Sequence, residues 1–359
     1  MTLQLLQFSL SARLLERTSG VTKMFFDQGI NMQGGESSQL AAVRPDAWEI
    51  EMKNDVHSLD RRRALQCMAW GGSGVLWTLV GGVPASKMVG AARAEMTKGF
   101  SFVQISDTHI GFDKAANNNV AGTLNETLLK ISSLSERPAF LLHTGDITHL
   151  SKQKEFDDAD QLIGASRLAV HRVPGEHDVL DEKTGEIYLA RYGKGTSGDG
   201  WYSFDAGGAH FIGLVNVLRL EGAGLGRLGA DQIAWLAADL ATRSASTPIV
   251  IFAHMPLWTI ASEWGWGTQD SAQALQLLAR FGSVTILNGH IHQVAQKVEG
   301  NLVFHTARST AFPQPEPGTA KAPGPKVVPA EQLRSFLGLT NVSFRGGAHK
   351  LAIIDTTLS

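Results

Sequence analysis

Acidic and histidine side chains recur in short clusters along the chain, and their types suit the binding of metal ions. Imidazole and carboxylate groups are better ligands for Mn, Fe and Zn ions than for Mg. Their number exceeds what one ion requires, which favours two divalent ions about 3.5–4 Å apart. In order, the clusters are Asp107-x-His109, Gly145-Asp146, Gly175-Glu176-His177-Asp178, His254 and Gly289-His290-x-His292.

The third cluster places two carboxylates and an imidazole in one tight turn, directly after Val173-Pro174. Neighbouring carboxylates repel each other unless a cation neutralises them. The turn therefore predicts that Glu176, His177 and Asp178 face a bound cation, whose remaining ligands come from the other clusters.

The clusters follow apolar stretches of strand-like composition, and helical spacing of apolar residues fills several intervals between them. Strands and helices that alternate in this way predict an α/β fold built in layers. Open α/β sheets bind ligands at the carboxyl ends of their strands, which is where the clusters fall. Strands are expected near 102–106, 139–142, 168–170, 201–204, 210–217, 248–252, 284–287, 294–298, 302–305 and 351–354, and helices near 119–135, 152–164, 233–240 and 271–281.

The composition is that of a globular protein with a sizeable core. The 359 residues are 43% hydrophobic and 18% charged, with a formal net charge of -2. This charge gives no basic signature for a nucleic-acid partner. The single cysteine, Cys67, excludes an intrachain disulfide framework.

Residues 52–94 have the features of a twin-arginine signal peptide. Arg61-Arg62-Arg63 precede a glycine-rich apolar run at 68–84, and Ala92-Arg93-Ala94 offers a cleavage site. The apolar run is too short and interrupted to span a bilayer. We therefore expect the twin-arginine export machinery as a partner and a periplasmic or secreted location; the alternative is a surface amphipathic helix.

The remaining chain divides into two parts. Residues 1–51 lack clear periodicity and are expected to be a disordered or mis-annotated extension, with translation starting at Met52. Residues 95–359 hold all the clusters and are expected to form the functional domain. Six prolines within 312–329 predict an irregular loop there.

The joint pattern of clusters resembles the calcineurin-like metallophosphoesterases, and among them the bacterial class III cyclic-nucleotide phosphodiesterases. The family pattern is D-x-H, G-D, G-N-H-D/E, H and G-H-x-H, and the resemblance covers residues 102–298. It implies a four-layer αββα sandwich, two divalent metal ions (Mn, Fe or Zn), and hydrolysis of a small-molecule phosphate ester. The implied nucleophile is a metal-bridging hydroxide, with phosphodiesters favoured over monoesters.

The resemblance also assigns roles to individual residues. His177 would stabilise or protonate the leaving-group oxygen, and Asp178 would orient His177 by a hydrogen bond. Asp146 would bridge the two ions. The first ion would be bound by Asp107, His109 and His292, and the second by His254, His290 and the residue at position 176.

Position 176 departs from the family, which has a neutral Asn where this chain has Glu176. Two divalent ions, two aspartates and a hydroxide sum to +1, and an ionised Glu176 lowers that sum to zero. A neutral centre should attract phosphate dianions less. Glu176 either binds the second ion or points away from a vacant second site.

Other histidines are expected to be structural. These are His143, His171, His210, His305 and His349. His149 stands where the related purple acid phosphatases have a tyrosine ligand, which disfavours that subgroup. It is either structural or in contact with the phosphate.

Two segments have alternative interpretations. Trp258, Trp264 and Trp266 either pack their own loop or form a rim that stacks on the substrate. The proline-rich loop at 312–329 either forms a second wall of the site or merely covers the sheet. Besides a phosphodiesterase, the chain could be a phosphomonoesterase, a secreted metal- or phosphate-binding protein with little turnover, or an interaction module.

Overall fold

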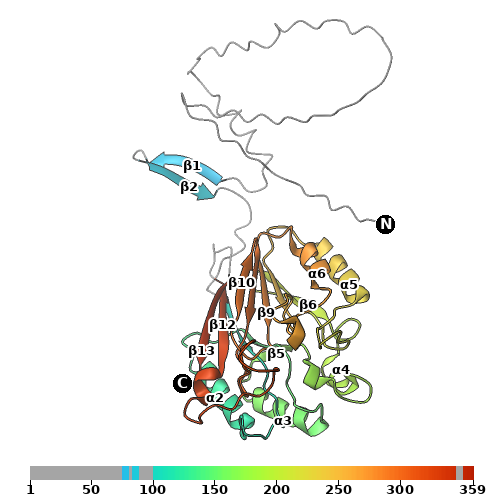
Figure 1. Ribbon diagram of the computed structural model, residues 1–359. Coiled ribbons are helices and arrows are strands. Elements are labelled where there is room, and N and C mark those ends of the chain that lie inside the picture. The colour runs from blue at the N-terminus through green and yellow to red at the C-terminus, as the bar shows by residue number, and fades with distance from the viewer. Residues whose placement is uncertain (1–74, 81–82, 89–99, 345–350) are drawn as a thin grey trace, which may run out of the picture. The chain divides into compact units, whose positions relative to one another are not determined.

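The computed structural model describes residues 75–80, 83–88, 100–344 and 351–359 (Figure 1). The predicted extension at 1–51, the arginine motif of the signal peptide and His349 lie outside these residues. Val75–Val80 (β1) and Val83–Met88 (β2) pair antiparallel within the predicted signal peptide. No helix in the described ranges is both long and apolar enough to cross a membrane.

Two mixed sheets form the rest of the described structure (Figure 1). The five-stranded sheet has the order β13-β12-β3-β4-β5, and the six-stranded sheet has the order β10-β11-β9-β8-β7-β6. The strands of the first are Phe100–Ile105 (β3), Phe140–His143 (β4), Ala169–Arg172 (β5), Gly338–Phe344 (β12) and Ala352–Thr357 (β13). Those of the second are Tyr202–Ala206 (β6), Ala209–Gly213 (β7), Ile249–Phe252 (β8), Val284–Asn288 (β9), Gln296–Glu299 (β10) and Leu302–Thr306 (β11).

The central strands of each sheet run parallel, so their carboxyl ends meet at one edge. β3, β4 and β5 are parallel neighbours, as are β7, β8, β9 and β11. The helices are Val120–Ser132 (α2), Gln153–Gly164 (α3), Glu186–Tyr192 (α4), Ala230–Ala241 (α5), Ser271–Leu278 (α6) and Leu333–Phe336 (α7).

Three apolar cores hold the layers together. Between the sheets, Phe102 packs edge to face on Phe211, with ring centroids 5.2 Å apart. On the outer face of the five-stranded sheet, Val103 and Ile105 pack against α2 and α3. On the outer face of the six-stranded sheet, Ile251 packs in a third core with residues of α5 and α6. This arrangement confirms the predicted four-layer αββα sandwich.

The sequence pattern missed β12 and the short helices α4 and α7. β12 contains Gly338 and Asn341, residue types that are depleted in strands, and its apolar alternation is short. It is a strand because β3 and β13 pair with it on both sides. Tertiary pairing therefore overrides the weak local propensity.

Candidate metal centre

The predicted ligands lie on loops at the carboxyl ends of strands from both sheets. Asp107 and Asp146 follow β3 and β4, and Glu176 lies in a short 3-10 turn soon after β5. His254 and His290 follow β8 and β9. The His290 N–H donates to Asp107 Oδ1 at 3.1 Å, which ties the loops of the two sheets together.

Several of these residues have a left-handed backbone, which is uncommon for residues other than glycine. The φ angles are 54° at Asp107, 53° at Asp146 and 71° at His290. His109 and His292 also have positive φ, at 42° and 56°. Such conformations cost about 1–3 kcal/mol each and persist where the surrounding structure enforces them, often at functional sites.

The side chains form two adjoining groups whose ligand atoms lie within 4.8 Å of one another in each group. The first group is Asp107, His109, Asp146 and His292, and the second is Glu176, His254 and His290. Asp146 lies between the groups, since its Oδ2 is 3.4 Å from His109 Nε2 and 3.5 Å from His254 Nε2. The structure thus brings all seven predicted metal ligands together.

Lone pairs converge within this cluster, as expected at a cation site. His254 Nδ1 lies 2.7 Å from the Thr144 carbonyl, so it carries the proton and leaves Nε2 as an acceptor. That Nε2 lies 2.8 Å from Glu176 Oε2 without hydrogen-bond geometry, and both atoms are buried. Two acceptors that face each other repel unless a proton or a metal ion lies between them. The donor set therefore fits divalent metal ions.

The pKa directions show the same excess of negative charge. Burial and the neighbouring Glu176 raise the pKa of Asp146 well above its usual value. Burial lowers the pKa of His254, but Asp146 and Glu176 outweigh it and raise that pKa well above normal. Without an ion, protons on Asp146 and His254 neutralise the cluster; divalent ions compete with these protons for the same atoms.

Glu176 belongs to the second group, contrary to the alternative in which it points away. Its Oε1 lies 2.9 Å from His290 Nδ1, and its Oε2 faces His254. Burial raises the pKa of Glu176, but His290 and His254 outweigh it and hold that pKa well below its usual value. The Glu176 carboxylate is therefore ionised, and it points towards the position expected for the second ion, between His254 and His290.

The predicted hydrogen bond between Asp178 and His177 is wrong. The buried Asp178 carboxylate instead accepts the N–H groups of Ile147, Thr148 and Gly175 at 3.0, 2.8 and 3.0 Å. A buried carboxylate is stabilised by such donors, and the Asp146 loop supplies two of them. Asp178 therefore fastens the turn at 175–178 to the loop of the bridging Asp146, and does not orient the imidazole.

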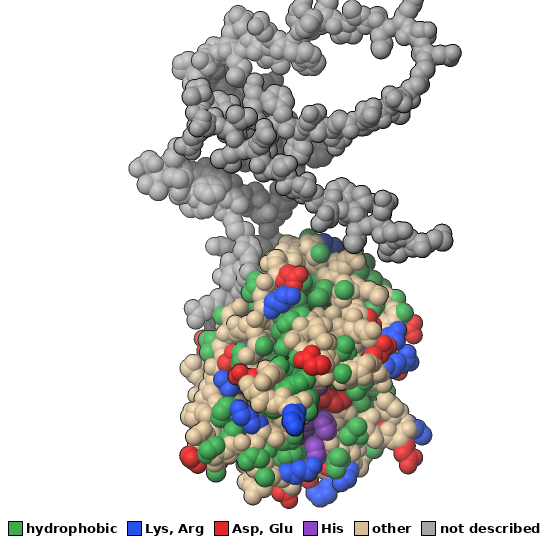
Figure 2. All heavy atoms as spheres, viewed as in Figure 1, with side chains coloured by type: hydrophobic (Ala, Val, Ile, Leu, Met, Phe, Trp, Pro, Cys, Tyr) green, Lys and Arg blue, Asp and Glu red, His purple; other side chains and the backbone are tan. Residues whose placement is uncertain are grey.

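His177 is oriented by His149. The Nδ1 of His177 donates to the His149 carbonyl at 2.8 Å, which leaves Nε2 free. The two rings stack with centroids 4.9 Å apart and an interplanar angle of 18°. Both side chains are partly exposed, and Figure 2 shows histidine at the surface beside Lys and Arg side chains. The His149 carbonyl could not be recognised from the sequence, since every residue has one.

His177 and His149 also lie close to the ligand groups. Ligand atoms of His177 lie within 4.8 Å of those of Asp146 and Glu176, and also of those of His109 and His149. This places His177 at the open side of the centre. Its predicted role toward the leaving group remains a prediction.

Two glycines of the clusters are required by the close approach of the loops. A Cβ at Gly175 would lie 2.1 Å from Asp146 Oδ1, and a Cβ at Gly289 would lie 1.9 Å from Ser106 Oγ. Neither distance is sterically allowed. The glycines of the motifs are thus part of the geometry that brings Asp146 to the 175–178 turn.

We expect Gly175→Ala to weaken the binding of both ions, because the new methyl group displaces the Asp146 carboxylate between the two groups. Gly164→Ala is the matched control, since nothing lies within 4 Å of its Cβ position at the end of α3. Metal content after gel filtration measures the effect. Equal metal content in both variants would contradict the steric argument.

In the tryptophan segment, Trp264 and Trp266 pack their own loop, which is one of the two predicted alternatives. Trp266 is 1% exposed, and Trp264 meets it edge to face with centroids 5.1 Å apart. Both belong to a small core with Ile291, which lies between the two histidines of the last cluster. Trp258 packs on Phe304 with centroids 5.1 Å apart.

The other described histidines make structural contacts away from both ligand groups, as predicted. His143 bonds to Thr108 at 3.1 Å, and burial lowers the pKa of His143 to about 3. His171 stacks on Phe204, His210 contacts Asp205 and Asp239, and His305 contacts Asp355.

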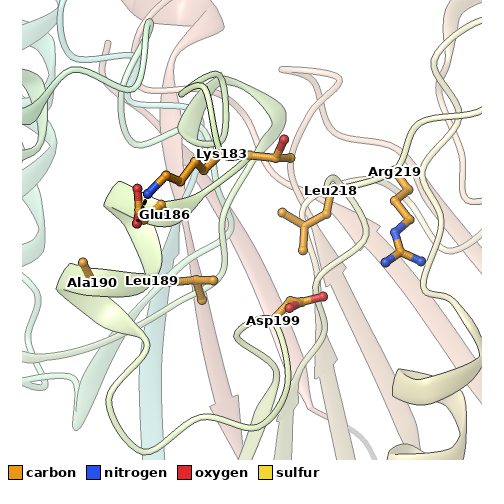
Figure 3. A pocket seen from close by; sticks show the side chains of 8 residues that line it. Lys183, Glu186, Leu189, Ala190, Asp199, Leu218 and Arg219 are labelled. Atoms are coloured by element: carbon orange, nitrogen blue, oxygen red, sulfur yellow. Dashed lines mark hydrogen bonds and ion pairs between the residues drawn. The ribbon is translucent and has the colours of Figure 1, made fainter.

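A cavity of about 740 Å³ lies between α4 and the loop after β7 (Figure 3). Its lining includes Lys183, Glu186, Leu189, Leu218 and Arg219. Lys183 pairs with Glu186 at 2.8 Å, and none of the predicted ligands lines the cavity. The cavity is therefore distinct from the metal centre.

Comparisons with known proteins agree with this geometry. A glycerophosphodiester phosphodiesterase GpdQ from Enterobacter lignolyticus (strain SCF1) is 25% identical over 223 residues, which cover 59% of this chain and 77% of that relative. A probable cyclic nucleotide phosphodiesterase from Vesicomyosocius okutanii is 25% identical over 59% of this chain and 87% of that relative.

The fold is shared with solved structures. A dimetal phosphatase from Danio rerio has a TM-score of 0.57 at 16% identity, covering 72% of this chain and 96% of that one. The model of the family described as calcineurin-like phosphoesterase matches residues 100–294, which is more than half of the chain. The two ligand groups at the strand ends are those of a dinuclear centre, and the chain belongs to the calcineurin-like phosphoesterase family of metal-dependent phosphoric ester hydrolases.

Proposed function

We propose that this phosphoesterase is a phosphodiesterase that acts on small-molecule diesters after export from the cytoplasm. Relatives named as a glycerophosphodiester phosphodiesterase and a probable cyclic nucleotide phosphodiesterase support the diester class. The identity of the group esterified to the phosphate is left to experiment.

The observation that carries the choice of diester is the third carboxylate of the centre. Before a hydroxide is counted, two divalent ions and the carboxylates of Asp107, Asp146 and Glu176 sum to +1, whereas a neutral residue at 176 would leave +2. A monoester is a dianion near neutral pH and a diester is a monoanion. The lower positive charge therefore weakens the attraction of monoesters more than that of diesters.

The positions of the site residues suggest a separate role for each of them. Two bound ions supply Lewis-acid stabilisation and lower the pKa of a water molecule. Asp146 lies between the two ligand groups and joins them. His177 is partly exposed beside the metal centre, and its Nε2 has no hydrogen-bond partner among the described residues. In the imidazolium form, in which Nε2 also carries a proton, His177 can give that proton to the departing oxygen.

The direct test compares two substrates with the same leaving group. The full chain, with its metal content measured, is assayed on bis(4-nitrophenyl) phosphate and on 4-nitrophenyl phosphate. We expect the larger kcat/KM for the diester. A larger value for the monoester would show a phosphomonoesterase, and two bound ions without turnover of either would show a binding protein.

We expect Glu176→Asn to raise the monoester-to-diester ratio of kcat/KM several-fold at saturating metal. The substitution raises the charge of the centre by one, which favours the dianion. It also weakens the second ion's binding, so the assay requires excess metal. Glu155→Gln is the control: Glu155 is a buried acid of α3 outside both ligand groups. An unchanged ratio together with unchanged metal content would show that Glu176 does not reach the ions.

Export is tested in cells. If residues 52–94 are a twin-arginine signal peptide, changing Arg61 and Arg62 together to Lys should trap the precursor in the cytoplasm. Immunoblots of fractionated cells measure this outcome. Undiminished periplasmic protein in the double variant would refute the export proposal and leave the hydrolase untouched.

A further inference from the structure

The start of the proline-rich loop contacts both halves of the last ligand cluster. Phe312 touches His292, and Gln314 touches the backbone of His290. These contacts come from two residues at the start of the segment that the sequence pattern had assigned to an irregular loop. They place the loop against the metal centre rather than over the sheet alone.

Phe312 holds the histidines of the first group in two ways. Its carbonyl accepts the Nδ1–H of His292 at 2.6 Å, which leaves His292 Nε2 free to face the ion. Its ring lies against the rings of His109 and His292, with centroids 4.8 Å away in both cases. The ring also packs against the Phe112 ring, with centroids 4.3 Å apart, and this contact fixes its position.

Gln314 holds the second histidine of the cluster through the main chain. Its Nε2 donates to the His290 carbonyl at 2.9 Å. Its Oε1 accepts the N–H of Gly324 at 3.1 Å, which closes the proline-rich loop on itself. One side chain therefore joins the His290 backbone to the far arm of the loop.

The cluster needs such support because its backbone is strained. His290 and His292 have φ angles of 71° and 56°, in the left-handed region. Residues in this region keep their conformation only where neighbouring contacts enforce it. Phe312 and Gln314 supply these contacts from one short stretch.

We propose that Phe312 and Gln314 are positioning residues for the metal centre, through which the proline-rich loop sets how tightly each ion is retained. Phe312 acts on the first ion through His109 and His292, and Gln314 acts on the second through His290. Partners that orient metal ligands typically change metal affinity by about 10- to 100-fold when they are mutated.

The test measures metal affinity, not hydrolysis. Apo protein prepared with a chelator is titrated with Mn²⁺ by calorimetry, and metal content is counted after desalting. We expect Phe312→Leu and Gln314→Met each to weaken one of two binding steps by about 10- to 100-fold. The double variant should weaken both steps, because the two residues serve different ions.

Matched controls separate positioning from general loss of stability. Phe281→Leu removes a ring from the core beside α6, where Phe281 is 1% exposed and belongs to a core that contains none of the predicted ligands. Gln232→Met removes a buried amide of α5 that bonds to the backbone of Val215 and Leu228, outside both ligand groups and the proline-rich loop. We expect both controls to bind Mn²⁺ like the wild type.

Affinities of the two variants equal to those of their controls would overturn the proposal. So would a double variant that loses affinity at a single step. If Phe312→Leu does not fold, as judged by circular dichroism, the comparison of Gln314→Met with Gln232→Met tests the proposal by itself. None of these outcomes depends on which ester the enzyme hydrolyses.

Discussion

Asp146→Asn is expected to release or weaken both metal ions and to reduce kcat/KM by several orders of magnitude. Its carboxylate adjoins both ligand groups, with Oδ2 3.4 Å from His109 Nε2 and 3.5 Å from His254 Nε2. An amide keeps the size of the side chain but removes the charge that two cations share. The loss corresponds to several kcal/mol of transition-state stabilisation, on the order of what Lewis-acid action by the ions contributes.

The fold of the Asp146→Asn variant should persist. The Oδ1 atom accepts the N–H of His177 at 2.9 Å, and an amide oxygen can accept the same bond. Metal analysis after gel filtration and a diester assay measure the two effects. Asp355→Asn is the control, because Asp355 contacts His305 and Thr340 at a site between strands and belongs to neither ligand group. Two bound ions and full activity in Asp146→Asn would contradict the bridging role.

His177→Ala is expected to keep both ions and to slow esters with poor leaving groups by about 10²–10⁴. The His149 carbonyl holds His177 Nδ1, so Nε2 is the nitrogen available to the substrate. An alkoxide leaving group needs a proton as the bond to phosphorus breaks, whereas 4-nitrophenolate needs little. The rate should therefore depend more steeply on the leaving-group pKa in the variant than in the wild type.

A leaving-group series at saturating metal measures this slope. His171→Ala is the matched control, since His171 is also partly exposed and stacked on an aromatic ring, at 3.7 Å from Phe204, but contacts no predicted ligand. Equal losses across the series would show that His177 has another role. Loss of one ion would show that His177 is itself a ligand, since its ligand atoms adjoin those of Asp146 and Glu176.

The order and identity of the metal ligands were predictable because short motifs follow strand ends. A strand places its last residues at the sheet edge, and parallel neighbours bring their ends to the same edge. The predicted strand positions alone were therefore enough to place Asp107, Asp146 and His254 in one site. The four-layer fold followed from the family resemblance, and the alternating strands and helices agreed with it.

The directions in which the polar side chains point, and the partners they contact, could not be predicted from the sequence. Glu176 had two directions open to it, and the positions of His254 and His290 on the other sheet decided between them. Asp178 was assigned to the wrong partner, since its donors are the Thr148 hydroxyl and the main-chain N–H groups of Ile147, Thr148 and Gly175. Main-chain groups are the same at every residue and leave no trace in a sequence.

The aromatic residues show the same division. The sequence determined that Trp264, Trp266 and Phe312 lie in long connections near the ligand clusters. Only the tertiary structure decided that the tryptophans are buried around Ile291, and that Phe312 lies against His109 and His292. The physical reason is that side-chain identity and strand periodicity are local properties of a sequence. Contacts between loops from two different sheets exist only after both sheets have packed.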